Sequence, residues 1–287
     1  MFDKFSRSWS LAGQCFEVLK QDPGLLIFPL LSSMALLVLL GSFAVPVFTL
    51  YHGAIGSDVG DGGTTHTSRL MFYVLTYVFY VISYTVMMFF NSALISVALR
   101  RLDGESAGVR DGLAAAWGNF PAIVGYALIA ATVGTLLRAI EERVGFIGRI
   151  VVAIIGAGWT LATAMTLPVL VEENLGPVEA ISRSLDLLKD NWGENLIGNS
   201  GISLGMAVIA IPLMVIAALV MAGAMSTGAL GSIIAGMALF AITSILIGLV
   251  STTLHSIYTA ALYRFATGSK ENAGIDGDLL AGAYRSK

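Results

Sequence analysis

The sequence predicts an all-α membrane protein with six transmembrane helices and three cytoplasmic interfacial amphipathic helices. Only 12% of its 287 residues are charged, about half of the 25% that is usual for soluble domains. The charges are also clustered, which leaves five uncharged runs at 23–57, 70–99, 112–137, 150–171 and 195–263. Each run is long enough for the roughly 20 residues with which a helix crosses the hydrocarbon core.

The last run is about three times the length of one span. It contains the glycine-rich stretch MAGAMSTGALGS, which begins at Met221 and predicts a turn between two helices. The total is therefore six spans. Helices are expected because they satisfy their backbone hydrogen bonds internally, and the runs show no strand-like alternation. The first run is too long for the core of a cleavable signal peptide.

Positive charge sets the orientation of membrane helices, because lysine and arginine concentrate on the cytoplasmic side. With both termini inside, twelve lysines and arginines fall on the inner side and four on the outer side. The sequence therefore predicts a multi-pass protein of the cytoplasmic (inner) membrane with both termini cytoplasmic. Residues 269–287 are expected to form a cytoplasmic tail.

Three polar segments between the apolar runs have the spacing of amphipathic helices. In VEAISRSLDLLKDNW, which begins at Val178, apolar residues recur every three or four positions and share one helix face. Pro177 suits the first turn of this helix. The segments 2–19 and 109–120 have similar patterns. Each segment carries one tryptophan, a residue that favours the headgroup level, and the three predicted interfacial anchors are Trp9, Trp117 and Trp192.

A second similarity links the ends of two spans. NSALISVALRRLDG, which begins at Asn91, aligns without a gap with HSIYTAALYRFATG, which begins at His255. The two similarities together suggest a threefold internal pseudo-repeat within one transmembrane domain. Its units, at approximately 1–104, 105–175 and 176–268, would each consist of an amphipathic helix and a transmembrane hairpin. The alternative is three separate anchors with no common origin.

One stretch resembles a signature of known membrane proteins. TLPVLVEENLGPVEAISRSLDLLKDNW, which begins at Thr166, is similar to a pattern in bacterial six-helix membrane proteins related to the membrane domain of glycerophosphoryl diester phosphodiesterases. The features that match are Pro168, Glu172, Glu173, Gly176, Ala180, Ser182, Arg183, Ser184 and Lys189. Two other stretches, at 91–113 and 136–151, look closer to a branch of unassigned function. The resemblance implies a fold only, because the phosphodiesterase activity belongs to a separate catalytic barrel that these 287 residues do not hold.

The sequence contains no catalytic motif. HExxH, GxSxG, Walker and CxxC patterns are all missing, and no span carries two residues of the Asp, Glu, His or Cys type. Cys15 is the single cysteine, so no disulfide can form within the chain. The net charge of −3 gives no sign of nucleic-acid binding. We therefore expect no enzyme, no catalytic residue, no metal site and no cofactor.

Polar residues at mid-membrane depth are the first candidates for function. Asn91 and His255 lie nine residues before Arg100 and Arg264, which end their spans. At about 1.5 Å per residue, this places them roughly 13 Å deep. The same count back from Glu172 reaches Thr163. Asn91, Thr163 and His255 could line a polar mid-membrane site, or they could hydrogen-bond between helices.

The outer connection RAIEER, which begins at Arg138, predicts a charged cluster. Arg138 is three residues from Glu141 and four from Glu142, the spacing of helical ion pairs, and Arg143 follows. The cluster either ties two spans together or forms a charged constriction that contacts solutes or a neighbouring subunit.

Small residues in the later spans allow helices to approach closely. Gly201 and Gly205 form a GxxxG pattern, and Gly231 and Ala235 follow in the last span. Packing within the monomer is the first use expected of them, and a subunit interface is the second.

These features favour a non-enzymatic membrane scaffold. It would contact membrane lipid and would self-associate as a homo-oligomer or bind a membrane-protein partner. The alternative is a channel or transporter for a small solute, with Asn91, Thr163 and His255 as its site. Transporters usually have interrupted helices or buried charge, and no buried carboxylate is evident in the sequence.

Overall fold

A computed structural model describes residues 13, 15–56, 65–189 and 192–268. All regular structure in this part of the chain is helical, which confirms the predicted all-α class. Residues 15–21 form a helix ahead of the first labelled element. The elements that follow are η1 (Pro23–Leu26), α2 (Ile27–Gly56), α3 (Thr65–Leu102), α4 (Val109–Gly118), α5 (Phe120–Glu141), α6 (Phe146–Ala162), α7 (Thr166–Glu172), α8 (Pro177–Lys189), α9 (Trp192–Ser226) and α10 (Leu230–Ala266).

Five stretches of helix are long and apolar enough to cross a membrane. They are Pro23–Thr49, Leu70–Leu102, Phe120–Glu141, Phe146–Glu172 and Leu230–Ala266. The shorter apolar stretch Ala210–Ser226 belongs to α9. The chain is thus a multi-pass membrane protein by the length and composition of its helices.

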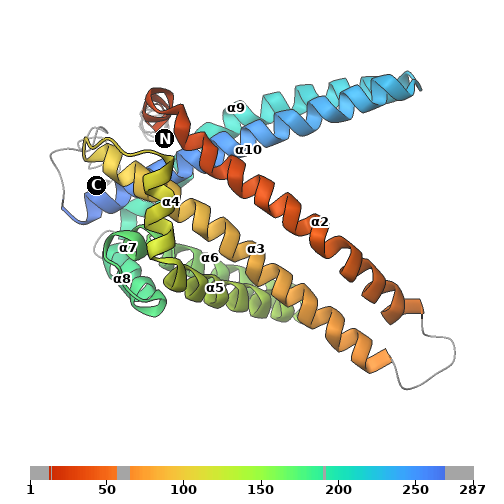
Figure 1. Ribbon diagram of the computed structural model, residues 1–287, viewed down its shortest axis with the longest axis horizontal. Coiled ribbons are helices and arrows are strands. Elements are labelled where there is room, and N and C mark those ends of the chain that lie inside the picture. Colours follow the sequence, from red (N-terminus) through yellow and green to blue (C-terminus); the bar gives the residue numbers. More distant parts are fainter. Residues whose placement is uncertain (1–12, 14, 57–64, 190–191, 269–287) are drawn as a thin grey trace.

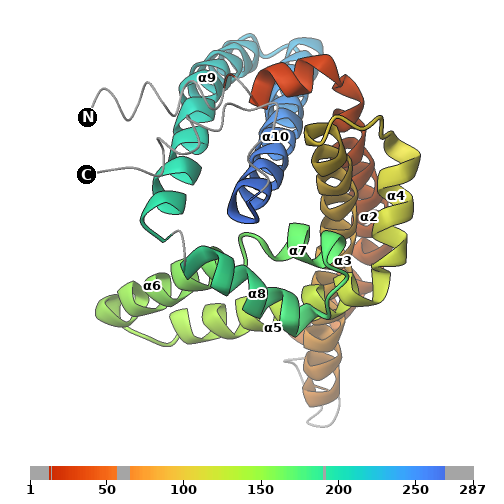
Figure 2. The same ribbon diagram turned by 90° about the vertical axis from the view of Figure 1, so that its left-hand side faces the viewer.

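The long helices form hairpins that point away from one shared end of the molecule. Figures 1 and 2 show α2–α3, α5–α6 and α9–α10 extending in different directions from that end. Helix α2 packs along α3, and α9 packs along α10. The turn between α9 and α10 lies at 227–229, inside the predicted turn, where Gly228 has a φ of +68°. Glycine suits this position because it has no Cβ to clash in the left-handed region.

The shared end holds most of the buried core, and we call it the base. It consists of residues 92–102 of α3 and 253–263 of α10, together with α7, α8, η1 and α4. Its largest fully buried side chains include Phe28, Leu94, Leu99, Met165, Leu170 and Ile257. Beyond the base, the large apolar side chains of the hairpins are mostly exposed.

The run 150–171, which the sequence predicts as one span, is divided into two helices. Helix α6 ends at Ala162, and α7 begins at Thr166. Pro168 in the first turn of α7 has no N–H, so it cannot donate the helical bond to Ala164 that would continue α6. Within the break, the N–H of Met165 donates to the hydroxyl of Ser184 on α8, at 3.1 Å. A side chain from another helix therefore stabilises the break.

Helices α4 and α8 both pack on the spans by one face. A Cβ on Gly112 of α4 would lie 2.6 Å from the carbonyl oxygen of Ala93 on α3. A Cβ on Gly125 of α5 would lie 2.8 Å from the ring of Pro177, the first residue of α8. Glycine at each place allows two helices to approach closely.

The buried face of α8 differs from the predicted apolar stripe. Ala180, Ser184, Leu187 and Leu188 are buried, whereas Val178, the first member of the stripe, is 67% exposed. The difference arises because α8 packs against α5, α6 and α7. The contact between Ser184 and the break before α7 therefore helps to determine which face of α8 is buried.

Candidate functional site

Three segments that are distant in sequence meet at an ionic cluster in the base. The guanidinium of Arg264, in the last turn of α10, contacts Glu172 at the end of α7 at 2.8 Å. The same Nη2 atom contacts Asp103, just after α3. The side chain of Arg264 is 14% exposed, and each carboxylate is 35% exposed. One arginine therefore joins the ends of three helices.

Glu173 extends this cluster to a fourth helix. Its carboxylate accepts a hydrogen bond from the hydroxyl of Tyr263 at 3.0 Å and one from Nε of Arg183 on α8 at 3.3 Å. We call Asp103, Glu172, Glu173, Arg183, Tyr263 and Arg264 the charged junction. Three carboxylates face two guanidiniums, and five of the six residues lie at or just beyond helix ends, so the arrangement suits a structural clamp.

A second ion pair closes the neighbouring side of the base. Asp22 Oδ1 accepts from the N–H of Gly24 and caps η1, while its Oδ2 lies 2.9 Å from Arg101 at the end of α3. A cavity of about 290 Å³ lies beside this pair. Its polar lining includes Glu17, Gln21 and Glu105.

The polar side chains buried among the described residues all carry hydroxyls, and all lie in the base. They are Ser92, Ser96, Thr166, Ser184, Thr253, Ser256 and Thr259. Thr253 and Thr259 donate to carbonyls one turn earlier in α10, and Ser184 accepts from Met165. The hydroxyls of Ser92 and Thr166 are buried without a partner in the described chain. Nε of Arg264 is also buried without a partner in the described chain. An unsatisfied buried hydroxyl costs about 1–3 kcal/mol, so both hydroxyls lower the stability of the base.

The predicted mid-membrane residues are not joined into one site by any described hydrogen bond. Asn91 and Thr163 are half-buried, and His255 is exposed on α10. The hydroxyl of Thr163 donates to the carbonyl of Trp159 at 2.9 Å, one turn earlier in the chain. Of the three, only Thr163 lies at the helix break. The buried Thr166, three residues further on, is a polar residue of the break that the sequence did not indicate, because its burial depends on contacts between helices.

The predicted outer cluster lies at the tip of the α5–α6 hairpin. Arg138, Glu141, Glu142 and Arg143 are all exposed, and the structure describes no ion pair among them. Glu142 caps α5 with helical backbone geometry, and its N–H donates to the carbonyl of Arg138 at 3.0 Å, so the predicted helical spacing is present without an ion pair between the side chains.

The small residues of α10 differ from the predicted packing set. Gly231 and Ala235 are exposed, so they do not pack within the described chain. Gly236, one position further, is buried, and a Cβ on it would lie 2.8 Å from Cβ of Ala224 on α9. The helical phase therefore turns Gly236 toward α9. Gly201 and Gly205 lie in a part of α9 whose side-chain surroundings are outside the described residues.

One of the three predicted tryptophan anchors has a described side chain. Trp117 at the end of α4 is 69% exposed and stacks on Phe120, with ring centroids 5.3 Å apart. Trp9 lies outside the described residues, and so does the side chain of Trp192. The exposure of Trp117 agrees with an interfacial position.

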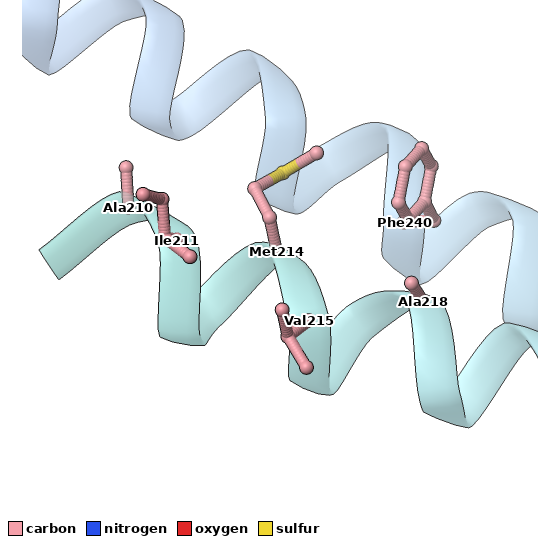
Figure 3. A pocket seen from close by; sticks show the side chains of 6 residues that line it. All are labelled: Ala210, Ile211, Met214, Val215, Ala218 and Phe240. Atoms are coloured by element: carbon pink, nitrogen blue, oxygen red, sulfur yellow. The ribbon is translucent and has the colours of Figure 1, made fainter. Parts of the chain in front are cut away.

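The α9–α10 hairpin carries an open apolar groove of about 350 Å³. Figure 3 shows its lining side chains, of which Met214 and Val215 come from α9 and Phe240 comes from α10. No polar side chain lines the groove. Its surface suits lipid chains or apolar protein side chains.

The described residues bring together no group of three or more His, Cys, Asp and Glu side chains that could hold a metal ion. Cys15 is fully buried, and burial raises the pKa of its thiol to about 12. A thiol that stays protonated is a poor nucleophile and a poor metal ligand. Cys15 is therefore a packing residue of the hydrophobic core.

A family model described as a family of unknown function (DUF6159) matches residues 70–273 of the chain. No curated protein and no solved structure matches it. Nothing in these comparisons supports the specific relation to the membrane domain of glycerophosphoryl diester phosphodiesterases that the signature residues suggested. The match extends from α3 to beyond α10 and includes the whole charged junction. The chain therefore belongs to the DUF6159 family, whose function is unknown.

Proposed function

We propose that the protein is a non-enzymatic membrane scaffold, which self-associates or binds a membrane-protein partner along its diverging hairpins. The observation that carries the proposal is the low burial of the spans. Only 11% of the most apolar window of α10 is buried within the chain, and the other four spans reach 17–28%. A transport path requires helices that close around it. Outside the base α5 packs on α3, where Tyr77 hydrogen-bonds to Thr132 at 2.8 Å, but the α9–α10 hairpin diverges from both.

In the proposed membrane arrangement α9 is the sixth span. Its 35 residues could reach roughly 52 Å, which exceeds the hydrocarbon core. The base would lie on the cytoplasmic side of the inner membrane, with both termini on that side. Support comes from the grouping of positive charge, because Arg100, Arg101 and Arg264 lie in the base while Arg138 and Arg143 lie at a hairpin tip.

The proposed pseudo-repeat is supported by the two helix ends that align in sequence. Residues 92–99 of α3 and 256–263 of α10 are buried throughout. Helix α3 ends at Leu102 and α10 at Ala266, which are matched positions. Two residues later, Gly104 and Gly268 have φ values of +80° and +86°. Matched burial and matched turns favour a common origin over independent anchors.

One observation favours a channel or transporter as the second candidate. The fourth span is interrupted between Ala162 and Thr166, and interrupted helices often form the binding sites of transporters. Thr163 lies at this break, and the unpartnered hydroxyl of Thr166 lies beside it. In this alternative Asn91, Thr163 and His255 would contact the solute.

The experiment combines mass measurement in nanodiscs with solute and ion flux in proteoliposomes. Self-association without flux is the expected result. Ala235→Leu, on the exposed small-residue face of α10, should lower the oligomer fraction. Ala241→Leu is the matched control, because Ala241 is also exposed but lies about 120° around the same helix. Flux that changes in His255→Ala would refute the scaffold. A strict monomer without flux would refute self-association and leave partner binding.

A further inference from the structure

We propose that the protein binds anionic phospholipid headgroups through Arg100 at the end of α3 and Arg110 at the start of α4, the helix that carries the exposed Trp117. The inference rests on the proposed placement of the base at a membrane surface and does not depend on self-association.

The argument begins with the ion pairs of the base. Most of its described cations already have a carboxylate partner. The pairs are Lys20 with Glu17, Arg101 with Asp22, Arg183 with Glu173, Lys189 with Asp186, and Arg264 with Asp103 and Glu172. Arg100 and Arg110 are both exposed, and neither has an ion pair in the described chain. Within the described part of the chain, they are the cations of the base that have no carboxylate partner.

Asp103 and Asp111, the carboxylates nearest in sequence to Arg100 and Arg110, both have other partners, and Asp103 pairs with Arg264. Asp111 Oδ2 accepts the N–H of Gly108 at 2.9 Å and caps the start of α4. Glu105 lines the cavity next to Arg101. None of Asp103, Glu105 and Asp111 forms an ion pair with Arg100 or Arg110 in the described chain, so none neutralises them at close range.

The position of the two arginines relative to the spans points to lipid. Arg100 lies in the last turn of α3, and Arg110 lies in the first turn of α4 after a loop of residues 103–108. Arg110 and Trp117 are seven residues apart, about two helical turns, so they share one face of α4. Trp117 is exposed and also meets the edge of Phe89 on α3, with centroids 6.2 Å apart. Tryptophan with arginine at the end of a span is typical of the headgroup level.

An acidic protein segment is the competing occupant. Lipid is favoured because α4 connects two spans directly, with α3 ending at Leu102 and α5 beginning at Phe120. The exposed face of α4 therefore lies where helices leave the hydrocarbon. Anionic headgroups attract cations at that level, with an effect of about fivefold in binding for each arginine.

The experiment measures how strongly brominated lipids quench Trp117 in the full-length protein. Nanodiscs of dioleoyl phosphatidylcholine receive either brominated phosphatidylglycerol or brominated phosphatidylcholine, and a Trp117→Phe variant supplies the background. Preferential quenching by phosphatidylglycerol is the expected result. Arg100→Gln with Arg110→Gln should weaken the preference about thirtyfold. The charge-preserving pair Arg100→Lys with Arg110→Lys should retain most of it.

Lys20→Gln with Lys189→Gln is the matched control, because it removes two base cations that already have partners. Equal loss in this control would overturn the assignment to Arg100 and Arg110. Equal quenching by both lipids would overturn headgroup recognition but keep the base at the membrane surface. Quenching by neither lipid would also overturn the proposed placement of the base. If an acidic peptide displaced phosphatidylglycerol from Arg100 and Arg110, the result would overturn the lipid proposal in favour of an acidic protein partner.

Discussion

Replacement of Arg264 by glutamine tests whether the charged junction holds the base together. Arg264 donates to Asp103 and Glu172, and hydrogen bonds to charged groups contribute about 1.5–3 kcal/mol each. Each carboxylate is 35% exposed, so water would replace part of what is lost. We therefore expect the free energy of unfolding to fall by about 2–4 kcal/mol. Arg183→Gln removes a more exposed single pair with Glu173 and should cost less than about 1 kcal/mol.

The assay is reversible unfolding of both variants in mixed micelles, followed by tryptophan fluorescence. Combination of Arg264→Gln with Glu172→Gln should cost less than the sum of the two single changes, because the second removes a carboxylate that the first leaves unpaired. Equal destabilisation by Arg264→Gln and Arg183→Gln, or strict additivity in the double variant, would refute the clamp.

Three further experiments probe the core of the base. Gly112→Ala should lower the free energy of unfolding by about 1–3 kcal/mol, because the added Cβ would collide with the Ala93 carbonyl. A Cβ at Gly118 would have no atom within 4 Å, so Gly118→Ala should be nearly neutral. Equal unfolding curves for the two variants would contradict this. Cys15 should resist a maleimide at pH 8, because a pKa of about 12 leaves roughly one thiolate in ten thousand. Labelling should become faster as the pH rises. Rapid labelling of the folded protein at pH 8 would show that the thiol is accessible. Thr166→Val should raise the free energy of unfolding by up to about 1 kcal/mol, since it removes a buried hydroxyl without a partner; a loss of stability would indicate a bound water there.

The helical class and several boundaries follow from the sequence. The glycine-rich stretch predicts the turn that contains Gly228, and Pro177 predicts the start of α8. The N-terminal helix ends before Pro23, as expected from its missing N–H. Local chemistry decides these features, so short patterns in the chain are sufficient to predict them.

The charged junction could not be predicted, because its members come from four segments far apart in the chain. Arg264 and Glu172 are visible in the sequence as the ends of spans, but only the packing of α10 on α3 and α7 brings them together. The break before Thr166 has a local signal in Pro168. Its stabilisation by Ser184 is a contact between helices, so no spacing rule could indicate it.

The divergence of the hairpins has a consequence for bilayers of different thickness. Helix α3 contains 38 residues and α10 contains 37, so each could reach about 55 Å, well beyond a hydrocarbon layer of about 30 Å. Long helices adapt to a thinner layer by leaning. Helix α5 packs on α3 outside the base, but the α9–α10 hairpin diverges from both helices. The α9–α10 hairpin can therefore change its inclination while the Arg264 clamp keeps its geometry. A change of lipid tail length should therefore alter the spread of the hairpin tips and leave their common root unchanged.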